Sequence, residues 1–330
     1  GADAPVVERT GGCNGHAELC DRPFDEVALP ATHNAMSIAA PDWFSAEQER
    51  PIAGQLRDGV RGLLIDTHYG DRLPDGRVRT VLDDDAAAGR GPLPDGVSET
   101  AVAAALRIRD RIGFAGQGKR GMFLCHSFCE LGATPVAEAL DAVHDFLVTH
   151  PDEVVVIVNQ DAVTPRDFVA AVRDAGLDRM AYDGPTTAPW PTLREMIDSG
   201  RRLVIMAEEH AGAAPWYRPV YDSITQETPY TFKRADLMTA SRRAATCAPN
   251  RGPDDAPLFL LNHWVSTDPL PRPVDARKVN ARDPLLGRAR ECARIRDRIP
   301  NLVAVNFYRQ GDVFGVVDAL NGIDRQAHGR

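Results

Sequence analysis

Short apolar runs that stop abruptly at polar, chemically active residues recur along this chain. The runs have the length and composition of buried strands, and segments with helical spacing lie between them. Strands that alternate with helices form a parallel sheet, and about eight such units over 330 residues favour a closed, TIM-type (β/α)8 barrel over a doubly wound sheet. The polar residues that follow the runs include His33, Asp66, His126, Gln160, Glu208, Asn262 and Asn306.

The apolar pattern sets the positions of the expected elements. Strands are expected at 26–30, 60–66, 121–125, 153–158, 202–206, 257–261 and 302–305. Helices are expected at 44–56, 98–112, 134–149, 164–175, 190–199, 283–298 and 316–320, with an irregular and then helical stretch at 229–245. The stretch 67–97 is too long for an ordinary loop, so we expect an insertion with a small hairpin there. Its acidic run, Asp83-Asp84-Asp85, is expected to be a solvated turn rather than a metal site.

Composition narrows the classes of partner. The chain has a net charge of −9 and no dense Lys/Arg cluster, so we expect no binding to nucleic acid and no bulk attraction to anionic membranes. No apolar stretch approaches the length of a membrane span, which leaves at most a transient contact with a membrane surface. No repeat or linker divides the chain, which is therefore expected to be one catalytic barrel domain over 1–330 and a monomer.

Six cysteines occur as the close pairs Cys13/Cys20 and Cys125/Cys129, with Cys247 and Cys292 further along. An even number suits a disulfide-bonded, secreted protein, and we expect nearest neighbours to pair. A zinc site is the alternative, although the spacing is not that of a CxxC motif. The chain starts without Met, as a processed extracellular protein would, and its preference for Arg over Lys suggests a bacterial source. Residues 1–24 are expected to form a cysteine-tied extension over the outside of the barrel.

A barrel would bring the polar residues that end its strands to one rim, where such folds carry their active sites. Two histidines there, His33 and His126, could act as general base and general acid near neutral pH. Asn34, Asp66 and Gln160 offer hard oxygen ligands, which suit Ca²⁺ or Mg²⁺ better than zinc. A structural Thr-His-Asn turn is the alternative interpretation of the first of these motifs.

The motifs that follow one another along the chain are Thr32-His33-Asn34, Gly59-Val60-Arg61-Gly62-Leu63-Leu64-Ile65-Asp66, Leu124-Cys125-His126-Ser127-Phe128, Pro151-Asp152-Glu153-Val154-Val155, Trp190-Pro191-Thr192 and Asn301-Leu302-Val303-Ala304-Val305-Asn306-Phe307-Tyr308. In this order they resemble the X domain of phosphatidylinositol-specific phospholipases C. The resemblance is greatest to the secreted, single-domain phospholipase C-like phosphodiesterases of bacteria and plants. It extends from about Cys20 to Gly322.

The resemblance implies a distorted (β/α)8 barrel with phosphodiesterase activity. It implies that His33 deprotonates a hydroxyl next to the phosphodiester and that His126 protonates the leaving alcohol, through a cyclic phosphate. Calcium-dependent relatives hold Ca²⁺ with an Asn, an Asp and two Glu. Asn34 and Asp66 match the Asn and the Asp, whereas the two glutamates have no counterpart in this chain. Calcium-independent bacterial relatives place an arginine near the phosphate. Arg61 or another arginine in the place of the cation is therefore the alternative to a weak calcium site.

The expected substrate is a phosphodiester of a lipid head group or phosphoglycan with little charge beyond its own, because Glu208 ends a strand where relatives tend to carry a lysine. Two other functions stay open. One is a lipid phosphodiesterase similar to glycerophosphodiester phosphodiesterases or sphingomyelinase D, whose Glu-x-Asp motif is missing at the second strand. The other is a catalytically weak barrel that binds a phosphorylated ligand. The residues expected to contact substrate are His68, Glu208, Asn262, His263, Trp264, Asn306 and Tyr308.

Overall fold

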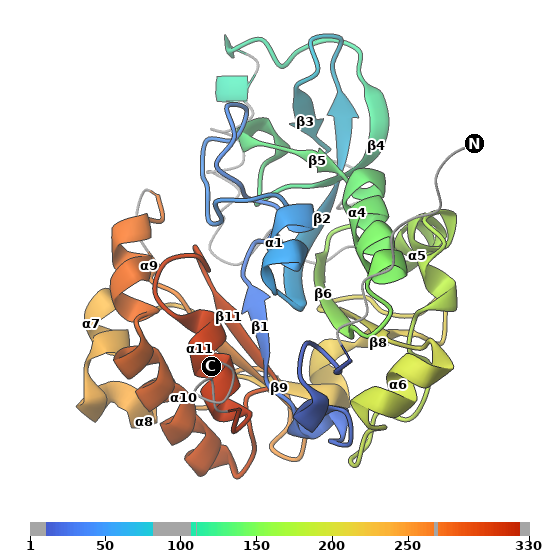
Figure 1. The fold of residues 1–330 in the computed structure, drawn as a ribbon. Helices are drawn as coiled ribbons and strands as arrows, with labels where there is room; N and C mark the ends of the chain where they lie inside the picture. Colours follow the sequence, from blue (N-terminus) through green and yellow to red (C-terminus); the bar gives the residue numbers. More distant parts are fainter. Residues whose placement is uncertain (1–10, 82–106, 110, 267–269, 324–330) are drawn as a thin grey trace.

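The computed structural model describes residues 11–81, 107–109, 111–266 and 270–323. Eight parallel strands lie side by side in the order β8-β7-β6-β2-β1-β11-β10-β9 and curl into an open barrel (Figure 1). These are β1 (Leu29–Thr32), β2 (Gly62–Arg72), β6 (Val155–Asp161), β7 (Leu203–Ala207), β8 (Tyr217–Pro219), β9 (Thr225–Glu227), β10 (Leu258–His263) and β11 (Leu302–Val305). The expected barrel is confirmed in a distorted form. The sequence pattern missed β8 and β9, which are three residues each and end the row.

Helices cover the outside of the barrel (Figure 1). The α-helices are α1 (Ile52–Asp58), α4 (Val136–Thr149), α5 (Pro165–Asp174), α6 (Leu193–Ser199), α7 (Arg234–Met238), α8 (Arg243–Thr246), α9 (Pro273–Val279), α10 (Arg282–Arg296) and α11 (Val313–Leu320). Short 3₁₀ or π turns are η1 (Ala17–Leu19), η2 (Phe24–Glu26), η3 (Cys129–Leu131), η4 (Leu177–Arg179), η5 (Val220–Ile224) and η6 (Ala240–Arg242). The helices expected from residue 134 onward are confirmed, whereas most of the helix expected at 98–112 lies outside the described residues.

The first expected helix is shorter than its pattern indicated. Helix α1 begins at Ile52 rather than at Phe44. The residues before it are tied to the ends of two strands, because the Gln48 amide donates hydrogen bonds to the backbone oxygens of His33 (2.8 Å) and Val305 (2.9 Å). These tertiary contacts override the helical spacing of the preceding stretch.

Side chains alternate between the two faces of the barrel wall, as they do along any strand. The interior cluster contains Leu29, Ala31, Val156, Val158, Val204, Met206, Leu258, Leu260, Leu302 and Ala304. For each of these strands, the residue two positions after the last interior residue is polar, and these residues are His33, Gln160, Glu208, Asn262 and Asn306. Asp66 follows Leu64 in the same way, and Leu64 packs against the interior cluster. The alternation therefore delivers these polar side chains to the inside of the carboxyl rim.

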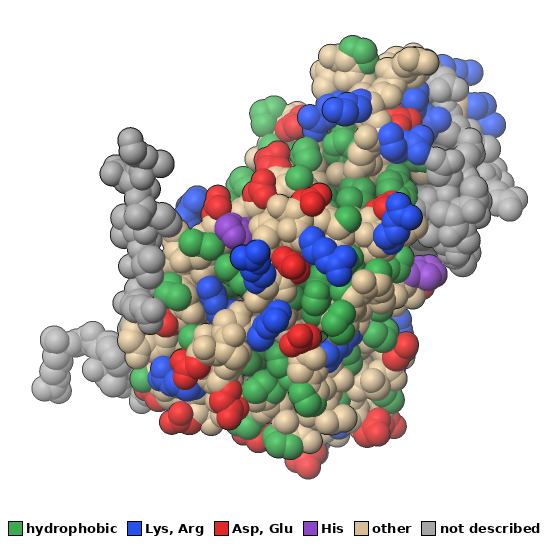
Figure 2. Space-filling model, turned by 90° about the vertical axis from the view of Figure 1, so that its right-hand side faces the viewer, with side chains coloured by type: hydrophobic (Ala, Val, Ile, Leu, Met, Phe, Trp, Pro, Cys, Tyr) green, Lys and Arg blue, Asp and Glu red, His purple; other side chains and the backbone are tan. Residues whose placement is uncertain are grey.

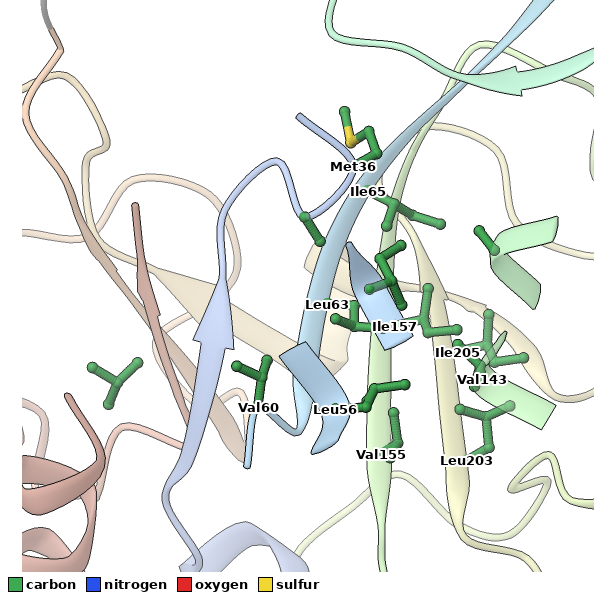
Figure 3. Packing of buried hydrophobic residues seen from close by; sticks show 14 of the residues in the cluster. Met36, Leu56, Val60, Leu63, Ile65, Val143, Val155, Ile157, Leu203 and Ile205 are labelled. Carbon is green, nitrogen blue, oxygen red and sulfur yellow. The ribbon is translucent and has the colours of Figure 1, made fainter. Parts of the chain in front are cut away.

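The opposite face of the wall packs against the helices. Figure 3 shows Leu63, Ile65, Ile157 and Ile205 from three neighbouring strands, close to Leu56 of α1 and Val143 of α4. All are buried in one continuous apolar cluster. Burial of such side chains stabilises the wall by about 1.5–3 kcal/mol each, so the rim is built on a rigid base.

The N-terminal segment closes the amino end of the barrel. Leu19 and Phe24 are buried in the same cluster as the barrel interior. A disulfide joins Cys13 to Cys20, and the Val154 N–H donates a 2.7 Å hydrogen bond to Asn14 Oδ1 just before β6. Residues 11–24 therefore plug the barrel and are not the outer cover that the polar composition indicated, and residues 1–10 lie outside the described residues.

Strand β2 continues past the rim and carries a second, antiparallel layer. It runs to Arg72 and pairs with β3 (Val78–Thr80), which confirms the expected hairpin. Strand β4 (Lys119–Leu124) also pairs with β2, and β5 (Thr134–Pro135) pairs with β4. Both pairings are antiparallel, so the expectation that the strand at 121–125 is a parallel barrel strand is wrong. The acidic run Asp83-Asp84-Asp85 lies outside the described residues.

On the face drawn in Figure 2, basic and acidic side chains lie intermingled over the barrel body. Within the β2–β4 layer the same mixing produces ion pairs. Asp71 forms salt bridges with Arg79 at 3.1 Å and with Arg120 at 2.7 Å, and Asp75 forms one with Arg77 at 2.8 Å. In the part of the chain that the structure describes, no helix combines the length and the apolar character needed to cross a bilayer.

Candidate active site

His33 follows β1 directly, and two side chains hold its ring. Its Nδ1 lies 2.8 Å from Asn306 Oδ1, the continuation of the neighbouring strand β11. Its ring stacks on Trp264, with centroids 3.6 Å apart and planes 3° from parallel. Because the amide oxygen accepts a hydrogen bond, Nδ1 carries the proton and Nε2 keeps its lone pair.

Burial sets the charge of His33. It lowers the pKa of the ring below its ordinary value of 6.5, although Glu47, Asn306 and Asp66 act in the opposite direction. The charge of His126 lowers this pKa further. His33 is therefore a neutral imidazole near pH 7, which is the form that takes up a proton.

His126 reaches the same rim from the antiparallel layer. Its Nδ1 lies 3.3 Å from Asp66 Oδ2, which accepts the Nδ1 proton, and the side-chain amide of Asn34 lies 3.0 Å from the same ring nitrogen. Burial alone would lower the pKa of His126, but the hydrogen bond to Asp66 and the charges of Glu47 and Asp66 together raise it to about 9. His126 is therefore an imidazolium near pH 7 and can donate the proton on its other ring nitrogen.

Three residues with left-handed backbone stand directly after a site residue. They are Asn34 (φ 44°), Ser127 (φ 62°) and Phe307 (φ 47°). Non-glycine residues adopt this conformation at a cost of about 1–3 kcal/mol, and such strain is concentrated at functional sites. The chain thus turns sharply at the point where each strand delivers His33, His126 and Asn306.

A disulfide brackets His126. The expected bond between Cys125 and Cys129 is present, as are those of Cys13 with Cys20 and Cys247 with Cys292. With all six cysteines in disulfides, the zinc alternative is ruled out for them. The Thr80 hydroxyl also accepts a 2.8 Å hydrogen bond from the Cys129 N–H, which ties the loop to β3.

Glu47 was missed by the sequence reasoning. Its side chain is 6% exposed, and Oε1 lies 3.9 Å from His33 Nδ1. The residue lies in the stretch that was expected to be helical. No periodicity or strand end marks it, so its place beside the histidines could not be read from the local pattern.

A second polar cluster occupies the rim beside β7, β9 and β10. The Arg251 guanidinium contacts Glu208 at 3.0 Å and Glu227 at 2.5 Å, and the Asn262 amide donates to Glu227 at 2.9 Å. Burial, assisted by the charges of Glu227 and Asp66, raises the pKa of Glu208 to about 7, although Arg251 opposes this shift. Glu208 and Asn262 are thus at the rim as expected, while Arg251 and Glu227 were not foreseen.

Three expected site residues lie elsewhere. Arg61 precedes β2 at the amino end of the barrel and donates a 2.7 Å hydrogen bond to Glu153, so it is remote from the rim. His263 follows the outward row of β10, donates to the Val279 carbonyl at 2.8 Å and accepts from Arg288 at 3.1 Å. Burial and the charge of Arg288 lower the pKa of His263 to about 3.

Tyr308 is the third expected site residue that lies away from the rim. The positions of two other expected site residues, His68 and Gln160, follow from β2 and β6. Tyr308 is buried in the outer cluster and donates its hydroxyl to Asp58 at 2.5 Å, on the side of α1. His68 is buried on β2, two residues beyond Asp66. Gln160 is exposed on β6 in register with Asp66.

The three residues expected to bind calcium are poorly suited to it. Asp66 is the single carboxylate among them, and Asp66 and Asn34 both contact His126. Calcium takes six to eight oxygen ligands, commonly several carboxylates. Over the described ranges, no group of three or more His, Cys, Asp or Glu could hold a metal ion. The residues do not fit a calcium ion, and we assign none of them, Gln160 included, as a metal ligand.

A family model described as PI-PLC X 1 matches residues 87–321. This chain belongs to the PI-PLC X domain family. The matched range contains His126 and begins after His33. The resemblance seen in the motifs is thereby confirmed at the level of the family.

Curated relatives cover nearly the whole PI-PLC X chain. "PI-PLC X domain-containing protein 1" of Arthroderma benhamiae is 25% identical over 94% of this chain and 90% of its own length. A PI-PLC X domain-containing protein of Arabidopsis thaliana is 26% identical over 98% of this chain and 68% of its own length. An "Uncharacterized secreted protein" of Arthroderma benhamiae is 26% identical over 97% of this chain and 66% of its own length. The chain spans about two thirds of the latter two relatives.

Solved structures agree with the fold of this PI-PLC X chain. The phosphatidylinositol-specific phospholipase C from Listeria monocytogenes superposes with a TM-score of 0.55 at 13% identity, over 93% of this chain and 96% of that one. A Staphylococcus aureus phosphatidylinositol-specific phospholipase C gives a TM-score of 0.50 at 11% identity, over 93% and 96%. At these identities the likeness establishes the barrel fold alone.

Proposed function

We propose that this chain is a phosphodiesterase that cleaves a phosphoinositol-type ester by internal attack, with His33 as general base and His126 as general acid. The observation that carries the proposal is the placement of two histidines at one rim with different partners: His33 Nδ1 lies 2.8 Å from the neutral amide of Asn306, and His126 Nδ1 lies 3.3 Å from the carboxylate of Asp66. Burial keeps His33 neutral, and Asp66 keeps His126 protonated. The names of the relatives and the shared fold support the substrate class.

The reaction divides into two steps that use the histidines in turn. First, the hydroxyl next to the phosphodiester gives its proton to Nε2 of His33 while its oxygen bonds to phosphorus. The bond to the leaving alcohol breaks, and that oxygen takes the proton of His126. In the second step a water gives a proton to His126 and attacks phosphorus. The ring oxygen leaves with the proton of His33, which restores both charge states and yields a linear phosphate.

We also propose that the protein is secreted. All six cysteines are paired in three disulfides, which persist in oxidising compartments. One relative carries the word "secreted" in its name. Partners other than the substrate, the monomeric state and a bacterial source remain expectations from the sequence.

Phosphorus NMR of phosphatidylinositol hydrolysis in mixed micelles tests the proposal. We expect a cyclic inositol phosphate to accumulate, and His33→Ala and His126→Ala each to lower turnover by about 10²–10⁴-fold, the usual worth of general acid–base catalysis. The control is His144→Ala on the outer helix α4, which should leave turnover unchanged.

Other outcomes would contradict the proposal. A linear phosphate that forms without a cyclic species would favour the mechanism of the glycerophosphodiesterase-like alternative. Binding of the head group without turnover by the unmodified protein would favour the catalytically weak barrel.

A further inference from the structure

The carboxylate of Glu47 is buried beside His33, with Oε1 3.9 Å from Nδ1, and is only partly used by the fold. Its charge acts on His33 and on His126. Over the residues that the structure describes, Glu47 Oε2 is buried without a hydrogen-bond partner. A buried carboxylate oxygen with no donor costs stability, so a functional explanation is called for.

The backbone fixes where this carboxylate lies. The Glu47 N–H donates to the Ser37 carbonyl at 2.9 Å, and the Phe307 N–H donates to the Glu47 carbonyl at 2.7 Å. Ser37 and Phe307 belong to the turns that follow β1 and β11. Glu47 is therefore held by the same two strand ends that deliver His33 and Asn306.

Asn306 and Glu47 supply different things to His33. Asn306 Oδ1 accepts the Nδ1 proton and so fixes the ring, but a neutral amide adds no charge. When His33 accepts a proton from substrate, its ring becomes a cation in a half-buried place, where an opposite charge is more effective than in water. Asp66 also acts on His33, but it is hydrogen-bonded to His126.

We propose that Glu47 is the counter-charge of the base His33, while Asn306 orients the ring. In a Ser-His-Asp triad one carboxylate both orients the histidine ring and balances its charge. Here Asn306 would orient the ring and Glu47 would balance the charge. Glu47 acts through His33 and is a positioning residue, not a catalytic one. The inference rests on the proposed function, since it concerns the same reaction.

The test compares Glu47→Gln with Glu49→Gln. Glu49 is a matched control, because it is two residues away, accepts a 2.5 Å hydrogen bond from Gln310 and has a buried oxygen without a partner. Its charge is not among those that act on either histidine. NMR of the histidine rings should show that Glu47→Gln lowers the pKa values of His33 and His126, and that Glu49→Gln changes neither.

Turnover supplies the second readout. Glu47→Gln should lower kcat by about 10–100-fold, the size of an electrostatic contribution near the reacting atoms, with KM changed less than about twofold. Adding Asn306→Asp to that variant returns a charge to Nδ1 of His33, and should restore both its pKa and most of kcat. Rescue of this kind would not follow if Glu47 were merely structural.

The outcomes separate this inference from the proposed function. An unchanged pKa of His33 in Glu47→Gln overturns the inference whether or not a substrate is found. A lowered pKa in a protein that turns over no phosphodiester overturns the proposed function and leaves the counter-charge assignment standing. If Glu47→Gln fails to fold, Glu47→Asp, which moves the charge by one methylene, should still shift the pKa of His33, and no shift would overturn the inference.

Discussion

Asp66 Oδ2 lies 3.3 Å from Nδ1 of His126, although Asp66 lies within β2 and His126 comes just after β4, which runs in the opposite direction. Strand β2 carries the chain up past the rim, and β4 brings it back alongside, with Leu124 opposite Thr67. The Cys125 N–H then donates to the Asp66 carbonyl at 3.3 Å. His126 therefore reaches the rim from the layer above the barrel, whereas His33 reaches it from the end of a barrel strand.

The charge states of the two histidines predict a bell-shaped pH profile of kcat/KM. Activity should fall at pH values below 6.5, where His33 becomes protonated, because burial lowers its pKa. It should fall again above about 9, where His126 loses its proton. Asp66→Asn removes the hydrogen bond and charge that raise the pKa of His126, so its upper limb should move to lower pH. Asp145→Asn on the exposed face of α4 is the control, and an unmoved limb in Asp66→Asn would contradict the assignment.

The Cys125–Cys129 disulfide should matter more for catalysis than for stability. Its small ring is worth about 2 kcal/mol of unfolded-state entropy, against about 4 kcal/mol for the long loop of Cys247–Cys292. Replacing Cys125 and Cys129 by Ser should lower kcat at least about tenfold, because the loop carries His126. Replacing the other pair should lower the melting temperature more and kcat less. Calorimetry and turnover of both double variants check this, and equal kcat losses would refute it.

His263 provides the contrast to the two site histidines. His263→Ala leaves Arg288 and the Val279 carbonyl short of a partner in a buried place, so it should lower the free energy of unfolding by about 2–5 kcal/mol. The turnover of the folded protein should stay unchanged. Because the folded pKa is about 3 and the unfolded one about 6.5, this histidine also makes stability fall as pH drops from 6.5 toward 3. Denaturant titrations at pH 7 and pH 5 check both statements, and a variant as stable as the parent would contradict them.

The barrel and the rim could be predicted because they follow from a repeated local pattern. His33 and Asn306 each follow an apolar strand, Asp66 ends the apolar run inside β2, and the carboxyl ends of parallel strands meet at one edge. The direction of β4 could not be predicted, since alternation of side chains is the same in parallel and antiparallel strands. The antiparallel direction of β4 follows from the length of β2. Strand β2 extends beyond the barrel rim, and β4 pairs with the part that extends.

Site residues that do not lie at strand ends could not be predicted from the sequence. Glu47 and Arg251 lie in connecting segments, where no periodicity announces a place at the site. The outward position of His263 could be recognised from the alternation along β10. His263 points to the same side as Phe259 and Leu261, which face the helices, whereas Asn262 points to the same side as the interior residues. In a strand buried on both faces, however, the two sides can be told apart only once the inward row is known.

Removal of divalent cations should leave most of the activity in place. Asp66 contacts His126, and among the described residues no group of three or more His, Cys, Asp or Glu side chains could hold a metal ion. Turnover after dialysis against a strong chelator should stay within about twofold of the untreated protein. Restoration of a lost activity by micromolar Ca²⁺ would show that the site rearranges to bind the ion, and would return Asn34 and Asp66 to the role expected from the sequence.

The cluster around Glu208 predicts selectivity against substrates that carry further phosphates. Two carboxylates, those of Glu208 and Glu227, share the single cation of Arg251, so an added phosphate at this part of the rim meets net negative charge when Glu208 is ionised. The pKa of Glu208 is about 7, and protonation below that value removes one of the two charges. The preference for unphosphorylated over bisphosphorylated phosphatidylinositol should therefore be larger at pH 8 than at pH 6. Glu208→Gln should reduce the preference at pH 8 by about three- to tenfold, while the exposed neighbour, in Glu209→Gln, should not. Competition between the two substrates at both pH values measures this, and a constant ratio across pH and variants would show that the Glu208 cluster does not read the head group.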